Sequence, residues 1–545
     1  MFSAKIQLIK MIQSKPNDYD LNLQLGMFCV NEKNYSEAKR IFKKLILINK
    51  SRYEGYLNLS NIYNISNKIN EAEKILKKFL IKNKYNKEII NGLASLYYNS
   101  NNYKKLNFLI NQYIDLDKNH ILFFLKAILF EVDNKTDLQI SFLYKSIDTN
   151  NNFWPAYEKL FSILERTNKI DEFEKIINLS KEIFKTNIQF YYYLSLCLFR
   201  KGEIKKAFAE LEIKKVEKEF IKFNNINYLT NLYDLLSKIH LTLKNFNLSL
   251  TYAIKRNSLS INYKNNQSSG KKDLLDIITK YKIYYKSFKK SKKNTLEGLA
   301  HNNLVFLVGF PRSGTTLLDT ILRSHSKTFV LEEKPYLINI RHKFFKKNTL
   351  DKINSINENQ IIKLQKEYFS SFDFSEKNLV IDKFPLNLIE LGFIKQIFPN
   401  SKIILALRHP LDTILSCVLT SFKVNEAMAN YENLDTSAFF YNEVFSLFNI
   451  YKNSLELNYH TIKYENVVIN FDNEMKNLLS FLNLEYEDSL KNYYITAKNR
   501  QKINTPSYHQ VIQPIYSKSI ERYKNFPEIK KIKPLIAKWI DEFNY

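Results

Sequence analysis

The fold of the C-terminal half is decided by the stretch Phe306-Leu307-Val308-Gly309-Phe310-Pro311-Arg312-Ser313-Gly314-Thr315-Thr316-Leu317. Its first residues are apolar and predict a buried strand, and its two threonines begin a helix. Between strand and helix, Gly309 and Gly314 stand in the G-x-x-x-x-G frame of a phosphate-binding loop. In such a loop the backbone N–H groups and the helix N-terminus surround an anion.

One residue of the nucleoside-triphosphate enzymes is missing from this loop. In those enzymes a lysine follows the second glycine and reaches the outer phosphates, and the next Ser or Thr binds magnesium. Here Thr315 takes the place of the lysine, and Arg312 supplies a positive charge from within the loop. The sequence therefore predicts a site for the 5′-phosphate of a nucleotide other than ATP.

Size and composition limit the class of protein. A chain of 545 residues is long enough for two or three domains. The formal net charge is +27, but Lys and Arg are spread along the chain, so we expect anionic ligands and no nucleic-acid partner. Three distant cysteines without metal or redox spacing are typical of a reducing compartment. Without a signal-peptide core or an apolar stretch of about 18 residues, we expect a soluble, cytoplasmic protein with no transmembrane segment.

Residues 1–260 repeat with a period of about 34, a length that resembles the tetratricopeptide repeat. Ala38, Ala72, Leu106 and Ile140 occupy equivalent positions in successive copies. The same spacing relates Tyr35, Ile69 and Tyr103, and also Leu25, Leu59 and Leu93. Such hairpins of two helices stack into a superhelix with a concave groove that normally binds peptides or protein segments. We therefore predict an all-α superhelix of about six or seven repeats, with an irregular helical bundle as the alternative.

A linker with a basic helix is predicted at residues 261–302. It begins with a polar segment that ends in Gln-Ser-Ser-Gly, and a basic run follows at Lys286, Lys289, Lys290, Lys292 and Lys293. The basic run is either a solvated helix face or a means of attracting an anionic substrate.

Residues 303–545 alternate short apolar strands with helices. The expected strands are Leu304–Val308, Thr328–Leu331, Leu379–Ile381, Ile403–Leu407 and Thr461–Tyr464. The expected helices between them include Thr315–Ser324, Leu386–Ile397 and Leu411–Thr420. This alternation predicts an α/β P-loop-like domain with a parallel sheet, whose ligand binds at the carboxyl ends of the strands.

Charged and polar residues follow several of these strands directly. Glu332 and Glu333 follow the second, Asp382 and Lys383 the third, and Arg408 the fourth, with Ser416 in the helix after it. Because parallel strands end at one edge of a sheet, we expect these side chains to form one site.

Together these residues resemble the sulfotransferases that use 3′-phosphoadenosine 5′-phosphosulfate (PAPS), and above all the tyrosylprotein sulfotransferases and the bacterial repeat-fused enzymes. The similarity covers roughly 303–530 and six motifs in the right order. The resemblance implies that the donor is bound by Arg312, Ser313, Gly314, Thr315, Thr316, Lys383, Arg408, Ser416, Tyr464, Ser507 and Arg522.

The resemblance also implies a metal-free displacement at sulfur, in which a sulfuryl group passes from PAPS to an acceptor hydroxyl. Glu333 is the expected base, with Glu332 as the alternative, and Arg312 and Lys383 stabilise the charge on the leaving oxygen. This chain has Thr420 where the tyrosylprotein enzymes have a second arginine, and Tyr523 where they have tryptophan. The acceptor therefore stays open among protein tyrosine, a saccharide, a lipid headgroup and a small alcohol.

Two other functions are compatible with the sequence. A P-loop kinase or NTPase would use Asp382 to bind magnesium, although the missing lysine argues against it. An inactive scaffold would retain the repeats and a nucleotide-binding domain without turnover.

Overall fold

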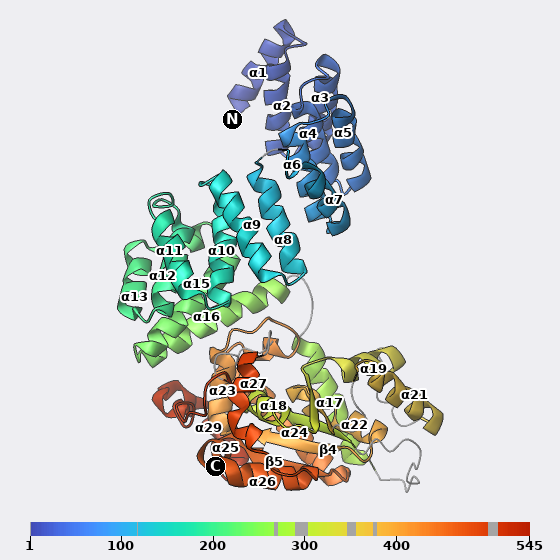
Figure 1. The fold of residues 1–545 in the computed structure, drawn as a ribbon, viewed down its shortest axis with the longest axis vertical. Helices are drawn as coiled ribbons and strands as arrows, with labels where there is room; N and C mark the ends of the chain where they lie inside the picture. Colours follow the sequence, from blue (N-terminus) through green and yellow to red (C-terminus); the bar gives the residue numbers. More distant parts are fainter. Residues whose placement is uncertain are drawn as a thin grey trace. The chain divides into compact units, whose positions relative to one another are not determined.

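The computed structural model describes residues 2–116, 118–265, 271–288, 303–345, 356–373, 379–499 and 511–545. It divides into two compact units, Met1–Gly202 and Glu203–Tyr545 (Figure 1). Among these described residues, none of the helices combines the length and apolar character needed to cross a bilayer. The domain boundaries at 260 and 302 stay predictions.

The first unit consists of helices that pack as consecutive antiparallel hairpins, beginning with α2 and α3. Its helices are α1 (Phe2–Ser14), α2 (Tyr19–Asn31), α3 (Tyr35–Ile48), α4 (Glu54–Ile65), α5 (Ile69–Lys82), α6 (Lys87–Asn99), α7 (Tyr103–Tyr113), α8 (His120–Val132), α9 (Thr136–Thr149), α10 (Trp154–Arg166), α11 (Ile170–Ser180) and α12 (Ile188–Arg200). Ala38, Ala72, Leu106 and Ile140 are all buried in the second helix of a hairpin, and Ile140 lies one residue further into its helix than the other three. The predicted helical repeat is confirmed.

The turn inside each hairpin repeats as regularly as the core. It contains one residue in the left-handed region, with φ between 55° and 59° at Lys33, Asn67, Asn101, Asn134 and Asn168. Asparagine tolerates this conformation better than most side chains. The next amide donates back to the end of the first helix, as Lys135 N does to Phe130 O at 2.8 Å. This is the Schellman ending of a helix, so the left-handed residue, lysine in the first turn and asparagine in the other four, marks where each first helix stops.

In its described residues, the second unit has five helices before the sheet. These are α13 (Ile204–Ile213), α14 (Val216–Lys222), α15 (Ile226–Thr242), α16 (Phe246–Asn265) and α17 (Lys271–Ser287). Helices α15 and α16 form an antiparallel pair, and α17 packs along α24 (Leu434–Ser454).

A five-stranded sheet forms the centre of this unit, with the order β2-β3-β1-β4-β5 and parallel pairing throughout. The strands are β1 (Leu304–Gly309), β2 (Thr328–Glu332), β3 (Leu379–Lys383), β4 (Lys402–Leu407) and β5 (Tyr459–Lys463). The first four lie within two residues of their predicted bounds, whereas β5 begins two residues before the predicted Thr461 and Tyr464 belongs to the next helix. The predicted parallel sheet is confirmed. In this order β1 has β3 on one side and β4 on the other, so the loop after β1 lies where the connections diverge, the usual ligand position in such sheets.

Helices cover both faces of the sheet (Figure 1). Alternate residues of β1 point to opposite faces, so that Phe306 packs with α17, α22 and α24 while Leu307 packs with α18 and α26. The remaining elements are α18 (Thr315–Arg323), α19 (Tyr336–Phe345), α21 (Glu358–Phe369), η1 (Pro385–Leu388), α22 (Leu391–Ile397), α23 (Pro410–Leu419), η2 (Met428–Tyr431), α25 (Tyr464–Ile469), α26 (Phe471–Leu482), η3 (Asp488–Asn492), α27 (Tyr493–Asn499), η4 (Arg522–Asn525), η5 (Pro527–Ile532) and α29 (Lys533–Glu542). Burial on both faces explains why the central strands β3, β1 and β4 are mainly apolar, whereas the edge strand β5 is polar and only partly buried.

One predicted helix has a different form in the structure. The segment predicted as a single helix over Leu386–Ile397 is a 3₁₀ turn, Pro385–Leu388, followed by the short helix Leu391–Ile397. Pro385 at the start fixes φ but donates no N–H, a combination suited to a first turn.

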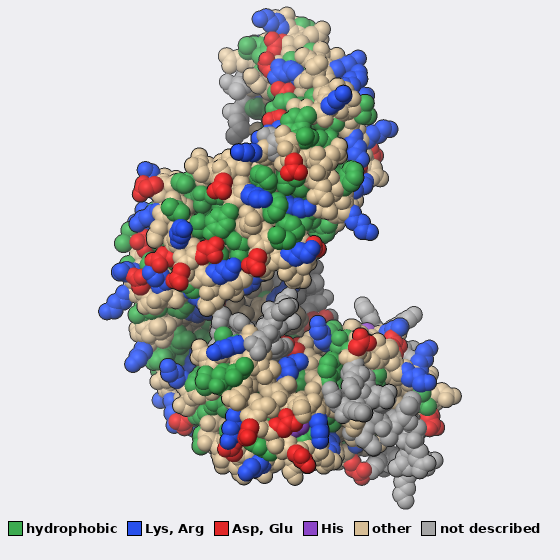
Figure 2. Space-filling view, in the orientation of Figure 1, with side chains coloured by type: hydrophobic (Ala, Val, Ile, Leu, Met, Phe, Trp, Pro, Cys, Tyr) green, Lys and Arg blue, Asp and Glu red, His purple; other side chains and the backbone are tan. Residues whose placement is uncertain are grey.

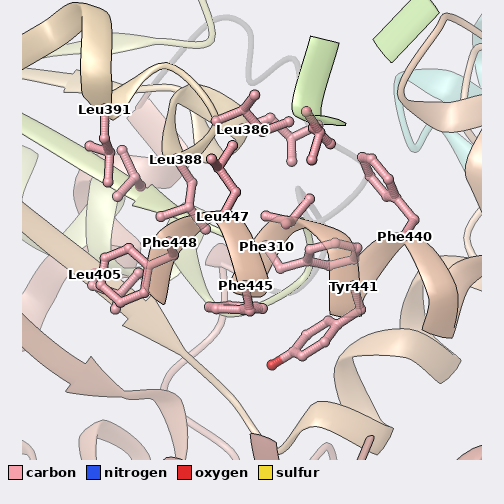
Figure 3. Close-up of a cluster of buried hydrophobic side chains, with 14 of the residues drawn as sticks. Phe310, Leu386, Leu388, Leu391, Leu405, Phe440, Tyr441, Phe445, Leu447 and Phe448 are labelled. Atoms are coloured by element: carbon pink, nitrogen blue, oxygen red, sulfur yellow. The ribbon is translucent and has the colours of Figure 1, made fainter. Parts of the chain in front are cut away.

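Phe310 anchors the loop after β1 in the core. Its ring lies 4.9 Å from that of Tyr441 and 5.6 Å from that of Phe440, both on α24 (Figure 3). Phe310 is fully buried, so the loop is fixed to the longest helix of the second unit on one side and is open to a cavity on the other.

Charged side chains are mixed on the face of the molecule that Figure 2 shows. Lys and Arg are interspersed there with Asp and Glu over both units.

Candidate active site

A cavity of about 410 Å³ lies at the carboxyl ends of the strands. This size is typical of a site for a small molecule. Among the residues predicted from sequence, its wall includes Arg312, Gly314, Thr315, Thr316, Glu333, Arg408, Ser416, Tyr464 and Arg522. The tertiary structure thus brings together side chains from the loop after β1, the ends of β2 and β4, helix α23 and the C-terminal segment.

Glycine is required at both ends of the loop. A Cβ atom on Gly309 would lie 2.5 Å from the backbone oxygen of Ala406 on β4. Gly314 has φ of 92°, and a Cβ atom there would lie 2.9 Å from Cδ2 of Tyr464. The first contact involves backbone and the second combines a close approach with a left-handed conformation, so a side chain at either position would displace the loop.

Two arginines and a serine are joined at the loop. Arg312, itself left-handed with φ of 73°, donates from Nε to Ser416 Oγ at 3.1 Å. Arg408 donates from Nη1 to the backbone oxygen of Arg312 at 3.3 Å and from Nη2 to the backbone oxygen of Ser519. Arg408 is 7% exposed, and its Nε has no hydrogen-bond partner among the described residues. A buried guanidinium with an unused donor at the cavity wall is suited to binding an anion.

Positive charge is concentrated in this part of the cavity. Burial lowers the pKa of Arg312, and the nearby guanidinium of Arg408 lowers it further. Burial followed by repulsion from Arg408 also lowers the pKa of Arg522, to about 10. Arg408 Nη2 lies 3.9 Å from Oδ2 of Asp412, which is a long distance for an ion pair. A bound anion would relieve the repulsion among the three arginines.

Lys383 lies behind the cavity in a group of carboxylates. It is completely buried, and its Nζ donates to Glu333 Oε1 at 2.8 Å. The same Nζ lies 3.6 Å from Oδ2 of the buried Asp319 and 4.0 Å from Oε1 of Glu332. Asp319 also accepts from Arg323 Nη2 at 2.9 Å. Burial of Lys383 is therefore compensated by ion pairs.

Glu332 and Glu333 differ in their access to the cavity. Glu333 lines it, its side chain is 36% exposed, and its left-handed backbone (φ 46°) directs the chain away from β2. Glu332 is the last residue of β2 and is buried, and it is not part of the cavity wall. Of the two, only Glu333 can meet a molecule in the cavity.

Two of the predicted site residues that the structure describes, Ser313 and Lys383, do not line the cavity. Ser313 is buried beneath the loop, with its Oγ unbonded among the described residues, and Lys383 reaches the cavity only through Glu333. Ser507 falls outside the described residues.

Asp382 points to the opposite face of the sheet from Lys383, where it accepts a hydrogen bond from Tyr368 Oη at 2.6 Å. This position gives no support to the magnesium role that a kinase would need, and no group of three metal-ligand side chains occurs in the part of the chain that is described.

Sequence reasoning missed the other half of the cavity wall. It is formed mainly by Phe384, Leu386, Ser421, Phe422, Lys423, Asn425, Met428, Tyr493, Tyr516 and Ser519. Phe384 directly follows Lys383 and could have been inferred from that motif. The segment after α23 carries no motif, so only its position in space identifies it.

Comparison with protein families agrees with this geometry. Residues 305–488 match the model of the sulfotransferase family. This region is similar to the sulfotransferase family. The match covers β1 to β5 and therefore the loop, Glu333, Lys383, Arg408, Ser416 and Tyr464. The finer resemblance to the tyrosylprotein branch stays a prediction.

Three individual proteins are similar to parts of the chain. An uncharacterized protein of Aquifex aeolicus (strain VF5) is 26% identical over 257 residues, and the match covers 44% of this chain and 33% of that protein. The chain thus spans about a third of the length of this curated relative. The sulfotransferase domain of the Synechococcus PCC 7002 olefin synthase is 17% identical with a TM-score of 0.33, covering 47% of this chain and 99% of that domain. Pseudomonas aeruginosa pilF is 15% identical with a TM-score of 0.32, covering 38% of this chain and 96% of its own.

Proposed function

We propose that this chain is a PAPS-dependent sulfotransferase that transfers a sulfuryl group to an acceptor hydroxyl. The observation that carries the proposal is the joining of Arg312, Ser416 and Arg408 at a glycine-bounded loop on one cavity wall. A nucleotide with phosphate at two positions needs positively charged groups at both, and these arginines can supply them.

The residues at the cavity fit the two anionic ends of the donor. The N-terminus of α18 and the hydroxyls of Thr315 and Thr316 suit the 5′-phosphosulfate, because unpaired N–H groups at a helix start attract anions. Arg408, with its unused Nε, and Ser416 suit the 3′-phosphate. The ring of Tyr464 also lines the cavity, and the guanidinium of Arg408 lies 5.1 Å from its centroid.

The chemistry is an in-line displacement at sulfur. The acceptor oxygen forms a bond to sulfur as the bond between sulfur and the bridging oxygen breaks, and Glu333 takes the hydroxyl proton. A positioned base of this kind contributes about 10²–10⁴-fold. Negative charge develops on the leaving phosphate oxygen, where Arg312 and the loop N–H groups stabilise it. Lys383, now paired with Glu333, both orients that carboxylate and adds positive charge beside it.

The acceptor would enter from the side of Phe384, Leu386, Phe422 and Met428, whose apolar side chains are suited to the body of an organic alcohol. The helical repeats would dock a protein or a carrier that presents this alcohol. A cytoplasmic location, with PAPS as the donor in that compartment, is part of the same proposal.

Calorimetry with adenosine 3′,5′-bisphosphate (PAP) tests the donor site. We expect PAP to bind in the presence of a metal chelator, and Arg408→Ala to weaken binding by at least about 100-fold, the loss of a charge-assisted hydrogen-bond pair. Arg166→Ala, at an exposed position in the first unit, is the matched control and should bind as the wild type does. Binding of ATP with magnesium but not of PAP would contradict the proposal.

A further inference from the structure

The acceptor side of the cavity is formed by a segment without regular secondary structure. Helix α23 ends at Leu419 and the 3₁₀ turn η2 begins at Met428. Between them, Ser421, Phe422, Lys423 and Asn425 line the cavity, as does Met428 itself. We refer to residues 420–428 as the wall segment. Because this segment has no regular series of backbone hydrogen bonds, we expect its shape to depend on contacts with other parts of the chain.

Asn257, on helix α16, binds the backbone on both sides of the wall segment. Its Nδ2 donates to the backbone oxygen of Val418 at 2.9 Å and to that of Tyr431, also at 2.9 Å. Asn257 is 8% exposed, so water does not compete freely for these bonds. The two hydrogens of one amide therefore hold together the two points between which the wall segment leaves and re-enters the core.

Arg256, the preceding residue, caps helix α23. Its guanidinium donates to the backbone oxygens of Val418 at 2.9 Å, Leu419 at 3.3 Å and Thr420 at 2.9 Å. It is 1% exposed and is paired with Asp234 of α15 at 2.7 Å. The last carbonyls of a helix lack partners within it and carry partial negative charge, so a buried cation satisfies both needs.

Helix α16 lies directly behind the wall segment. A small cavity of about 40 Å³ separates them, lined on one side by Arg256, Asn257 and Ile261 and on the other by Ser421 and Phe422. The same Ser421 and Phe422 line the large cavity. The wall segment is thus a single layer of chain between the acceptor side of the cavity and helix α16.

We propose that helix α16 determines the shape of the acceptor side through Asn257 and Arg256, which act as positioning residues for the wall segment. The role in acceptor binding rests on the proposed function. The positioning of the wall segment by Asn257 and Arg256 does not depend on it. The proposal gives α16 a part in acceptor specificity, although this helix lies outside the sulfotransferase-family match. Asn257 precedes Val418 by 161 residues.

Two substitutions and one control separate this role from general stability. Asn257→Asp keeps the shape of the side chain but replaces the donating amide by oxygen, which repels the two carbonyl oxygens. Arg256→Lys keeps the charge that faces Asp234 but cannot donate to three carbonyls at once. Asn247→Asp makes the same chemical change at an exposed position on the same helix.

Hydrogen–deuterium exchange of the full chain is the deciding measurement, because it needs no turnover. We expect Asn257→Asp and Arg256→Lys to raise exchange in peptides covering 418–432 by about tenfold or more, with β1 peptides unchanged. Asn247→Asp should leave both regions as in the wild type. Unchanged exchange in 418–432, or an equal rise in β1, would overturn the proposal, the second outcome indicating a loss of general stability.

Kinetics then distinguish the acceptor side from the donor side. With 4-nitrophenyl sulfate as sulfuryl donor to PAP, the reverse reaction, we expect a fivefold or greater rise in KM for the aryl sulfate in Asn257→Asp. The affinity for PAP, measured by calorimetry, should change less than twofold. A parallel loss of PAP affinity would overturn the assignment to the acceptor side. Absence of turnover in the wild type would count against the proposed function alone, and the exchange result would still decide the role of α16.

Discussion

Glu332 and Glu333 are neighbours in the chain, but their carboxylates lie in different surroundings. The left-handed conformation at Glu333 turns its side chain into the cavity, while Glu332 stays in the strand and is buried. Lys383 holds one oxygen of Glu333 at 2.8 Å, which leaves the other for a substrate proton. Backbone conformation at one residue therefore decides which of two identical carboxylates reaches the cavity.

We expect Glu333→Gln to lower kcat by about 10²–10⁴-fold, since the amide cannot accept the hydroxyl proton. PAP affinity by calorimetry should stay within about twofold of the wild type. Glu332→Gln is the matched control and should retain most of the turnover. The reverse pattern, with Glu332→Gln inactive and Glu333→Gln active, would move the base to Glu332.

Asp382 illustrates a buried acid that the proposed chemistry does not use. Burial raises its pKa to about 7, although the hydrogen bond from Tyr368 and the charge of Lys383 oppose the shift. Between pH 3.8 and about 7 the folded protein keeps a proton that the unfolded chain releases. Folding stability from this group therefore falls as pH rises through that window.

Asp382→Asn should remove this dependence while keeping an oxygen for Tyr368. We expect the variant to be more stable than the wild type by ~2–4 kcal/mol at pH 8, and the difference to shrink towards pH 5. Denaturant unfolding of a Trp154→Phe background measures it, because Trp539 then reports on the second unit. A difference that is the same at pH 5 and pH 8 would contradict the raised pKa.

At the scale of elements, the helical hairpins end their first helices in the same way. One left-handed residue stops the helix, and the next amide bonds back to its last turn. Asn134 is an exposed example with φ of 57°, and we attribute its contribution to its backbone conformation.

We expect Asn134→Ala to destabilise the first unit by ~1 kcal/mol, because alanine is strained in the left-handed region. Asn134→Gly, which relieves that strain, should be neutral within about 0.5 kcal/mol. Thermal unfolding of the first unit, followed by the fluorescence of Trp154 in a Trp539→Phe background, gives both values. Equal destabilisation by Ala and Gly would show that the side chain and not φ matters.

At the scale of the whole molecule, the second unit extends beyond the sulfotransferase-family match. It begins at Glu203, whereas the match begins at residue 305. Helix α16 contributes Leu250 to the core on one face of the sheet and Arg256 and Asn257 to the wall segment. The helices before the sheet are thus part of the folded body that holds the site.

We expect a fragment of residues 203–545 to be more stable than one of residues 261–545. The shorter fragment lacks most of α16, including Leu250 and Arg256, and it leaves the carbonyls at the end of α23 and part of the core uncovered. Its Tm should be lower by about 10 °C or more, the effect of losing a few kcal/mol in a unit of this size. Equal Tm and equal PAP affinity for the two fragments would instead support the domain boundary predicted at residue 260.

The repeat period, the five strands and the loop that begins at Gly309 could all be predicted from the sequence. Each is a local property, because helix and strand periodicity and turn residues act over a few neighbours along the chain. The same reasoning placed Arg312, Arg408, Ser416 and Glu333 at one edge of the sheet, since parallel strands end together.

Only the tertiary structure decided which groups face the cavity and which lie behind it. Asp382 and Lys383 are adjacent but point to opposite faces, and Phe422 and Met428 reach the cavity from a segment without a motif. The bonds from Asn257 to Val418 and Tyr431 join residues more than 160 positions apart. Such contacts depend on how helices pack against one another. The pattern of side chains along the chain reflects only neighbours in sequence, so it does not predict contacts between residues so far apart.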